Sequence, residues 1–186
     1  TNGRVTGAAD DRGGVHAADC VVSCAGPATA EIAALASLKL AVGGEPGQLH
    51  YTAPVASMLT RPVHAPGVQI RPDGGGRIVL SEEAHDLVLE RAPQDGWTPE
   101  QSVAAAARYY PALTGARVEA TRVGVRPMPQ DRLPAVGSIP GLEGFYVVVS
   151  HSGVTLGPLW GQIAAREILA GVVDPRLDPF RPARLL

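Results

Sequence analysis

Small polar residues separate two strongly apolar segments near the C-terminus of the chain. Three valines (residues 147–149) run directly into the sequence SHSG (residues 150–153), and a helical pattern of apolar residues begins at once. A buried strand that ends before a helix places such a turn at the edge of an α/β sheet where ligands collect. The first N–H groups of the helix lack partners and carry about half a positive charge. The turn therefore suits an anion, or a group that gains negative charge during a reaction.

Three interpretations of this turn fit the residues. A phosphate would suit the helix start, but no Walker-type lysine follows and the sequence contains no G-x-G-x-x-G motif. The N1–C2=O edge of a reduced flavin, which becomes anionic, fits equally well. The turn can also be a tight strand-to-helix connection that binds nothing. Gly153 would allow close approach of a ligand, and Gly157 and Gly161 would leave a shallow groove along the helix.

The composition indicates a globular protein and argues against two classes of partner. Hydrophobic residues make up 45% and charged residues 18%, and the 16 basic and 18 acidic residues give a formal net charge of −2. The basic residues are scattered, so we expect neither nucleic acid nor an anionic membrane as a partner. No apolar run approaches the ~20 residues that span a bilayer. The first residues also lack the basic and apolar regions of a signal peptide.

The two cysteines, Cys20 and Cys24, lie four residues apart in a predicted buried strand. A rise of ~3.3 Å per residue separates them by about 13 Å, which is too far for a disulfide bond. We therefore expect reduced, partly buried thiols and a cytoplasmic protein. Because no second cysteine pair is present, and His16, His64 and His85 show no ligand spacing, we predict no metal site.

Apolar periodicity and turn residues predict the elements on either side of the SHSG turn. Ile32, Leu35 and Ala36 share one face of a predicted helix, and Leu156, Trp160, Ile163 and Ile168 form the packing stripe of another. The segment 128–144 contains three prolines and is predicted to be an extended loop. The expected elements are a hairpin (4–8 with 15–17), a strand (19–26), a helix (27–38), a strand buried on both faces (145–150), a helix (155–170) and a surface arm (174–186).

The middle of the chain has a different character. The glycine-rich segment 72–76 is a strong hairpin signal, Thr98 is suited to cap a helix, and Pro111 is suited to stop it. The expected elements are strands within 47–54, 67–81, 85–90 and 115–127, and a helix within 98–113. We expect 1–42 and 121–186 to form one α/β part, with 43–120 inserted as a mainly antiparallel sheet.

Three motifs follow one another in the C-terminal third: G-x-R-P at 124–127, D-x-x-P-x-x-G at 131–137 and H-S-G-x-T-L-x-P at 151–158. In this order they resemble the C-terminal part of the FAD-dependent oxidoreductases of the D-amino-acid oxidase, glycine oxidase and sarcosine oxidase type. Residues 19–36 resemble the strand and C-A-G turn of that family, near the adenosine side of its cofactor. Ser150 stands where the family more often has glycine. The strands within 47–81 resemble those of its substrate domain.

The resemblance implies an α/β (α+β) fold, in which a partial FAD-binding Rossmann-like domain carries an inserted, mainly antiparallel β-sheet substrate domain. Residues 1–42 and 121–186 would be the FAD part, and residues 43–120 the substrate part. The family begins with a strand, a G-x-G-x-x-G turn and a helix that hold the FAD pyrophosphate. This sequence has no counterpart of that unit, so the resemblance covers only the second half of the fold.

The resemblance also implies roles for particular residues. Arg126 would clamp a substrate carboxylate through two parallel hydrogen bonds; alternatively, it is a solvated residue that pairs with Asp131. Arg71 and His151 are further substrate-binding candidates, although an exposed hairpin arginine and a turn histidine bonded to backbone explain them as well. His50, Tyr109 and Tyr110 are better explained as core or domain-interface residues. The implied cofactor contacts are Cys24, Ala25, Gly26, Gly124, Arg126, Ser152, Gly153, Val154, Thr155 and Leu156, with backbone amides of residues 152–155 facing the pyrimidine edge of the flavin.

The family chemistry would be formal hydride transfer from the C–H of an amine or amino acid to flavin N5, giving an imine. FAD is the expected cofactor of the intact parent, and we expect this chain alone to be inactive. A second hypothesis is a flavin-free remnant that acts as a binding or interaction module. Because loss of the first βαβ unit would uncover apolar sheet edges, we predict a dimer, or association with the missing N-terminal half.

Overall fold

The computed structural model describes residues 3–56, 59–82 and 97–186. Their contacts divide the chain into two compact units: residues 1–45 with 126–186, and residues 46–125. The assignment of a cofactor domain and a substrate domain to these parts remains a prediction. The strand expected within 85–90 lies outside the described residues. No helix among the described residues is long and apolar enough to cross a membrane.

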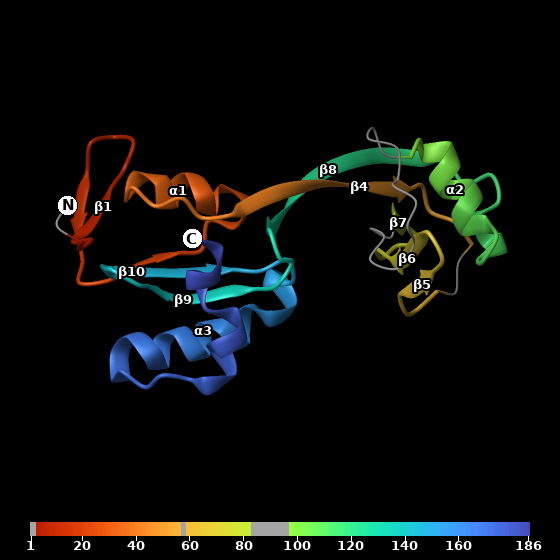
Figure 1. Ribbon diagram of the computed structural model, residues 1–186. Coiled ribbons are helices and arrows are strands. Elements are labelled where there is room, and N and C mark those ends of the chain that lie inside the picture. The colour runs from red at the N-terminus through yellow and green to blue at the C-terminus, as the bar shows by residue number, and fades with distance from the viewer. Residues whose placement is uncertain (1–2, 57–58, 83–96) are drawn as a thin grey trace. The chain divides into compact units, whose positions relative to one another are not determined.

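A three-stranded sheet with the order β3-β10-β9 forms the centre of the first unit. β3 (Val21–Ser23) is parallel to β10 (Leu142–Val149), and β9 (Ala135–Ile139) is antiparallel to β10. Helix α1 (Thr29–Leu35) lies on one face of this sheet and helix α3 (Gly153–Ala170) on the other (Figure 1).

Alternating side chains of β10 build a separate core on each face of this sheet. Phe145 and Val147 pack with Ala33 of α1 on one face. Tyr146 packs with Trp160 and Ile163 of α3 on the other. The expected strand buried on both faces is therefore confirmed. The expected hairpin is also present, as β1 (Gly7–Ala9) paired with β2 (Val15–Ala17).

The helix expected over 27–38 is shorter than predicted, and its buried face differs. A 3₁₀ turn (η1, Gly26–Ala28) precedes α1, which ends at Leu35. Leu35 is 84% exposed and Ile32 is 37% exposed, whereas Ala33 is fully buried. The prediction that Ile32, Leu35 and Ala36 share the packing face was wrong, because the small Ala33 occupies the position closest to the sheet.

The segment expected to be an extended loop, 128–144, contains β9 and the beginning of β10. Pro134 comes directly before β9 and Pro140 directly after it. Neither proline therefore removes a hydrogen-bond donor from the ladder. Gly141, with a φ of +76°, lies in the tight turn into β10. The prediction counted the prolines as loop signals, whereas they mark the ends of a strand.

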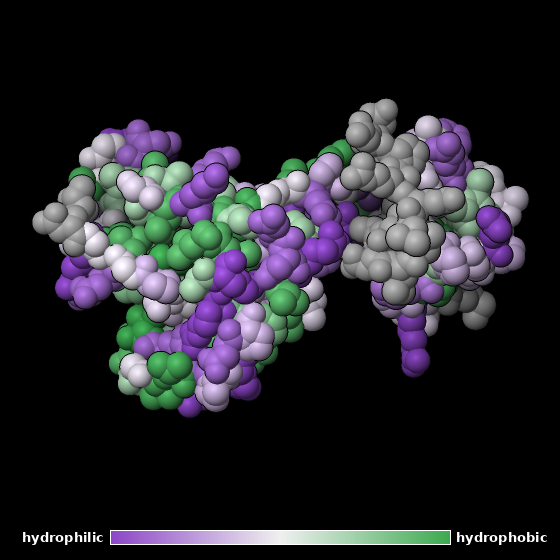
Figure 2. Space-filling model, viewed as in Figure 1, coloured by the Kyte–Doolittle hydropathy of each residue, from purple (hydrophilic) through white to green (hydrophobic). Residues whose placement is uncertain are grey.

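The C-terminal residues are not a surface arm. They form two 3₁₀ helices, η3 (Pro175–Phe180) and η4 (Pro182–Leu185). Leu177 is fully buried and Leu185 is 5% exposed, so the tail belongs to the core of the first unit. Exposed apolar residues gather instead around the C-terminal end of α3 (Figure 2), where Leu169 and Val173 are 85% and 71% exposed.

The second unit is built on a five-stranded sheet in the order β5-β6-β7-β4-β8. The pairings of β5 with β6, β6 with β7 and β7 with β4 are antiparallel. Helix α2 ends at Ala107, ahead of Pro111, which was expected to stop the helix, and a 3₁₀ turn starts at Pro111. The elements are β4 (Val42–Thr52), β5 (Val63–Ala65), β6 (Val68–Pro72), β7 (Ile78–Glu82), α2 (Pro99–Ala107), η2 (Pro111–Leu113) and β8 (Val118–Pro129).

Candidate functional site

The turn between β10 and α3 is stabilised by Ser150 rather than by a helix cap. The Ser150 hydroxyl accepts the N–H of Ser152 at 3.2 Å, and the Ser150 carbonyl accepts the N–H of Gly153, also at 3.2 Å. Ser150 is 6% exposed, so these bonds hold the turn from its buried side. Helix α3 begins at Gly153, two residues earlier than predicted.

The N-terminus of α3 keeps free hydrogen-bond donors. Ser152 occupies the N-cap position, but its side chain makes no capping hydrogen bond. Within the described residues, the N–H groups of Val154 and Thr155 have no backbone acceptor. Val154 is 97% exposed. These donors and the positive end of the helix dipole can therefore stabilise a negative group placed beside the turn.

A cavity of about 650 Å³ lies beside this turn. Five of the predicted site residues line it, and they come from the β3–α1 turn, the SHSG turn and the start of α3. It also extends along α3, past Gly157 and Gly161, where a shallow groove was expected. The predicted residues brought together here are Cys24, Gly26, His151, Gly153 and Val154.

The remaining predicted site residues do not line this cavity. Arg71 lies on β6, in the other unit. Sequence reasoning did not assign the apolar wall formed by Val22, Val148 and Trp160 to a site. Alternation along β3 and β10 could have identified that wall, since it places Val22 and Val148 on the face covered by α3. The other predicted residues outside the lining are Ala25, Gly124, Arg126, Ser152, Thr155 and Leu156.

Arg126 is half-buried near the end of β8, and its Nε is buried without a hydrogen-bond partner. Its expected alternative partner, Asp131, is bound instead by Arg184 through two guanidinium nitrogens. The hydrogen bonds from Arg184 hold the pKa of Asp131 below its usual value. The interpretation of Arg126 as a residue that pairs with Asp131 is therefore wrong. Among the described residues no ion pair occupies Arg126, and its role at the site remains a prediction.

The other polar residues considered in the sequence analysis differ in their exposure and in their hydrogen bonds. The His151 ring is exposed and makes no hydrogen bond to the described residues, so the backbone bond expected for it is absent. Cys24 is exposed rather than buried, whereas burial raises the pKa of the partly buried Cys20 thiol. His50 is a core residue, as expected: it is 1% exposed, and its Nδ1 lies 2.8 Å from the Thr121 hydroxyl.

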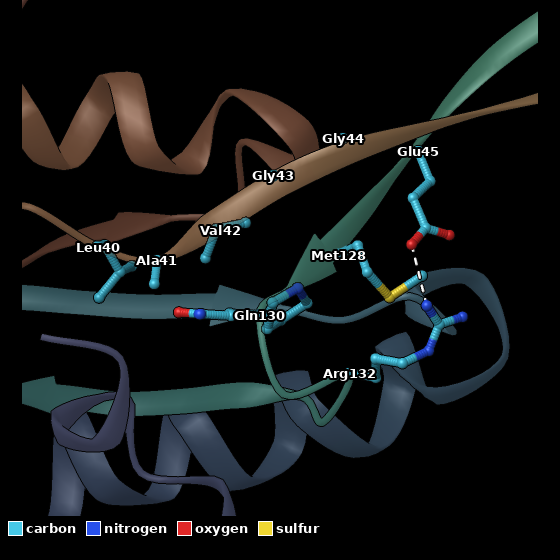
Figure 3. A pocket seen from close by; sticks show the side chains of 10 residues that line it. Leu40, Ala41, Val42, Gly43, Gly44, Glu45, Met128, Gln130 and Arg132 are labelled. Atoms are coloured by element: carbon cyan, nitrogen blue, oxygen red, sulfur yellow. Dashed lines mark hydrogen bonds and ion pairs between the residues drawn. The ribbon is translucent and has the colours of Figure 1, made fainter. Parts of the chain in front are cut away.

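A second, more open cavity of about 480 Å³ lies between the start of β4 and the end of β8, within the first unit (Figure 3). Glu45 and Arg132 form an ion pair at its rim, with an N–O distance of 2.9 Å. Both side chains are more than a third exposed, and such a pair contributes little to stability. The described residues include no group of three or more His, Cys, Asp or Glu side chains that could hold a metal ion.

The family model described as FAD dependent oxidoreductase matches residues 1–167 of the chain. The chain belongs to this family. An uncharacterized oxidoreductase of Bacillus subtilis, YurR, is 30% identical over 100% of the chain and 51% of its own length. A glycine oxidase of Pseudomonas aeruginosa is 29% identical over 97% of the chain and 50% of its own length.

The fold agrees with that of solved family structures. A crystal structure of glycine oxidase from Geobacillus kaustophilus superimposes with a TM-score of 0.78 and 28% identity, over 94% of the chain and 48% of that protein. The mixed α/β fold with antiparallel sheets expected from the resemblance is therefore confirmed. The chain spans about half the length of the relatives it matches.

Proposed function

We propose that this chain contributes the flavin-edge turn and the substrate-binding arginine of an FAD-dependent oxidoreductase that acts on an amino acid or amine. The observation that carries the proposal is the uncapped N-terminus of α3, which opens into the cavity beside the SHSG turn. Membership of the FAD-dependent family supports it. Glycine oxidases among the relatives favour an amino acid as the substrate class.

The residues present fit the edge of a flavin. No acidic side chain lines the cavity, so nothing there would repel a group that gains negative charge. A Cβ added at Gly26, Gly153 or Gly157 would meet no atom within 4 Å, which leaves room for a ring system beside the backbone. The sequence contains no G-x-G-x-x-G motif of the kind that holds the FAD pyrophosphate in this family, so the fit concerns the ring end of the cofactor.

When bound, FAD would supply the two-electron oxidation of the substrate C–H bond. The N–H groups of Val154 and Thr155 would stabilise negative charge at the pyrimidine edge. Arg126 would hold the substrate carboxylate through two parallel hydrogen bonds. The partly buried Val148 and the buried Trp160 would keep water away from the site, which strengthens both electrostatic effects.

A flavin titration of the purified chain tests this function. We expect FAD to show a shifted visible absorption spectrum and quenched fluorescence when the chain is added. Val154→Asp should weaken the binding of reduced FAD, measured without oxygen, roughly tenfold or more, because a carboxylate placed at the helix start repels the flavin edge that becomes anionic on reduction. Val154→Asn is the matched control, since it has the same shape without the charge and should bind FAD almost as the unchanged chain does.

The alternative function is a flavin-free interaction module. It predicts no change in the FAD spectrum, even when the unmatched half of the Geobacillus kaustophilus glycine oxidase is added as a separate polypeptide. Binding of FAD that responds equally to Val154→Asp and Val154→Asn would also contradict the proposed role of the helix start.

A further inference from the structure

Ser152 occupies the N-cap position of α3 without capping the helix. Serine is among the residues preferred at this position, because the side chain of an extended N-cap residue accepts a backbone N–H two or three residues later. Ser152 instead has a φ of −92° and a ψ of 36°, which is not an extended conformation, and its side chain makes no capping hydrogen bond. A residue type suited to cap the helix is therefore present in a conformation that does not cap it.

Helix α2 shows the same position with the cap formed. Its N-cap residue, Thr98, is extended, with a φ of −66° and a ψ of 158°, and the Thr98 hydroxyl accepts the N–H of Gln101, three residues later. The corresponding donor of α3 is the N–H of Thr155, which has no backbone acceptor among the described residues. A cap formed by Ser152 would therefore take up one of the donors proposed to face the flavin edge.

Hydrogen bonds on both sides of Ser152 hold its backbone in the non-capping conformation. Its N–H donates to the Ser150 hydroxyl at 3.2 Å, and its carbonyl accepts the N–H of Leu156 at 2.9 Å. Ser150 comes directly after β10 and is 6% exposed, so its hydroxyl is anchored at the end of the sheet. Because the peptide groups before and after Ser152 are both bonded, the residue cannot turn to an extended conformation without breaking one of these bonds.

We infer that Ser150 is a positioning residue that stops Ser152 from capping α3, and so keeps the Thr155 N–H available to a ligand beside the SHSG turn. The inference rests on the proposed function, which places the flavin edge at this turn. Ser150 acts through the backbone of Ser152. The effect is greatest for the reduced flavin, because a hydrogen bond to a charged acceptor is stronger than one to a neutral acceptor.

The hydroxyl of Ser150 can be removed without removing its other contact with the turn. The bond from the Gly153 N–H uses the Ser150 carbonyl, a backbone atom, so it persists in Ser150→Ala. The bond from the Ser152 N–H uses the side chain and is lost. Ser150→Ala therefore frees Ser152 to become extended and to cap the helix.

Amide hydrogen exchange of the chain without flavin, followed residue by residue by NMR, tests the positioning. In Ser150→Ala we expect roughly tenfold faster exchange of the Ser152 N–H, which loses its acceptor, and roughly tenfold slower exchange of the Thr155 N–H, which gains one. Ser138→Ala is the matched control, because Ser138 lies on β9 of the same sheet, is exposed and does not line the cavity. It should leave both rates unchanged. Unchanged rates in Ser150→Ala would overturn the inference.

Binding of FAD, measured by titration calorimetry without oxygen, tests the consequence for the ligand. Ser150→Ala should bind reduced FAD roughly tenfold more weakly, and oxidised FAD nearly as the unchanged chain does, because the lost donor matters most to a charged acceptor. Adding Ser152→Ala to this variant removes the hydroxyl that would cap the helix, so the double variant should recover its affinity for reduced FAD. A purely structural role of Ser150 predicts no recovery, and that result would overturn the inference.

Failure of the proposed function gives a different result. If the unchanged chain binds neither form of FAD, the proposed function is contradicted. The exchange rates of the Ser152 and Thr155 N–H groups, measured without flavin, then decide by themselves whether Ser150 keeps the helix uncapped.

Discussion

Glu167 connects three parts of the first unit through one carboxylate. It accepts the Tyr146 hydroxyl of β10 at 2.6 Å, and it accepts two hydrogen bonds from the Arg181 guanidinium at 2.8 and 2.7 Å. The N–H of Asp174 adds a fourth bond at 2.8 Å. Partial burial raises the pKa of Glu167, but the bonds from Arg181 and Tyr146 outweigh it and bring the pKa down to about 2.

The lowered pKa of Glu167 makes stability depend on acid pH. Because the folded pKa is below the ordinary value of 4.5, the stabilisation is fully present above that value and disappears as the pH falls toward 2. The difference corresponds to about 3 kcal/mol. We expect Glu167→Gln to lower the free energy of unfolding at pH 7 and to flatten its pH dependence between about 4.5 and 2, measured by urea denaturation. Glu31→Gln, at an exposed position, should leave that dependence unchanged.

Arg126 provides a second test of a single residue, in this case of substrate binding. The proposed function predicts the effect of Arg126→Ala in an FAD-loaded complex of this chain with the unmatched half of the Geobacillus kaustophilus glycine oxidase. The variant should raise the KM for an amino acid by roughly tenfold to a hundredfold, because a bidentate, charge-assisted bond contributes about 1.5–3 kcal/mol. An amine without a carboxylate should be oxidised with an unchanged KM. Arg122→Ala is the control, since Arg122 lies over the Tyr51 ring. Equal losses with both substrates would show that Arg126 has a structural role.

At the scale of elements, α2 shows which features the sequence specifies locally. Thr98 accepts the N–H of Gln101, and the Gln101 side chain accepts the N–H of Thr98, which completes a capping box. The cap was predictable because it uses only neighbouring residues. β9 was not predicted, because Pro134 and Pro140 are typical of loops. Only the structure shows that both prolines lie just outside the strand.

The capping box gives a prediction for α2. Thr98→Ala removes the acceptor for the N–H of Gln101 and should lower the free energy of unfolding by about 1 kcal/mol. Thr60→Ala is the matched control, at an exposed position outside the helices and strands. Chemical denaturation should show a lower free energy of unfolding for Thr98→Ala and an unchanged one for Thr60→Ala. If both change stability equally, the cap does not contribute to the fold of α2.

The candidate site could be predicted only in part, for a similar reason. Ser150, His151 and Gly153 are neighbours in the SHSG turn, and they line one cavity with Cys24 and Gly26. Strand alternation could have placed Val22 in the apolar wall, but the contribution of Trp160 depends on how α3 lies against the sheet, which no local pattern specifies. The partner of Asp131 was predicted wrongly, because Arg184 lies 53 residues away in the chain.

At the scale of the whole chain, the C-terminal residues complete the core of the first unit. Arg184 donates to the carbonyls of Leu133 and Pro134 before β9, and Arg181 is bound to Glu167 of α3. A Cβ at Gly137 would lie about 3.1 Å from Pro182, so the tail also packs closely on β9. Residues far from the SHSG turn in sequence thereby support the sheet on which the turn is built.

This packing predicts a sharp contrast between two leucines of the tail. Leu177 is fully buried, whereas Leu186 is 56% exposed. Leu177→Ala should therefore lower the free energy of unfolding by about 2–5 kcal/mol, because it removes buried apolar area and leaves a cavity. Leu186→Ala should change it by no more than about 0.5 kcal/mol. Urea denaturation followed by circular dichroism compares the two, and equally small effects would mean that the tail is a peripheral arm after all.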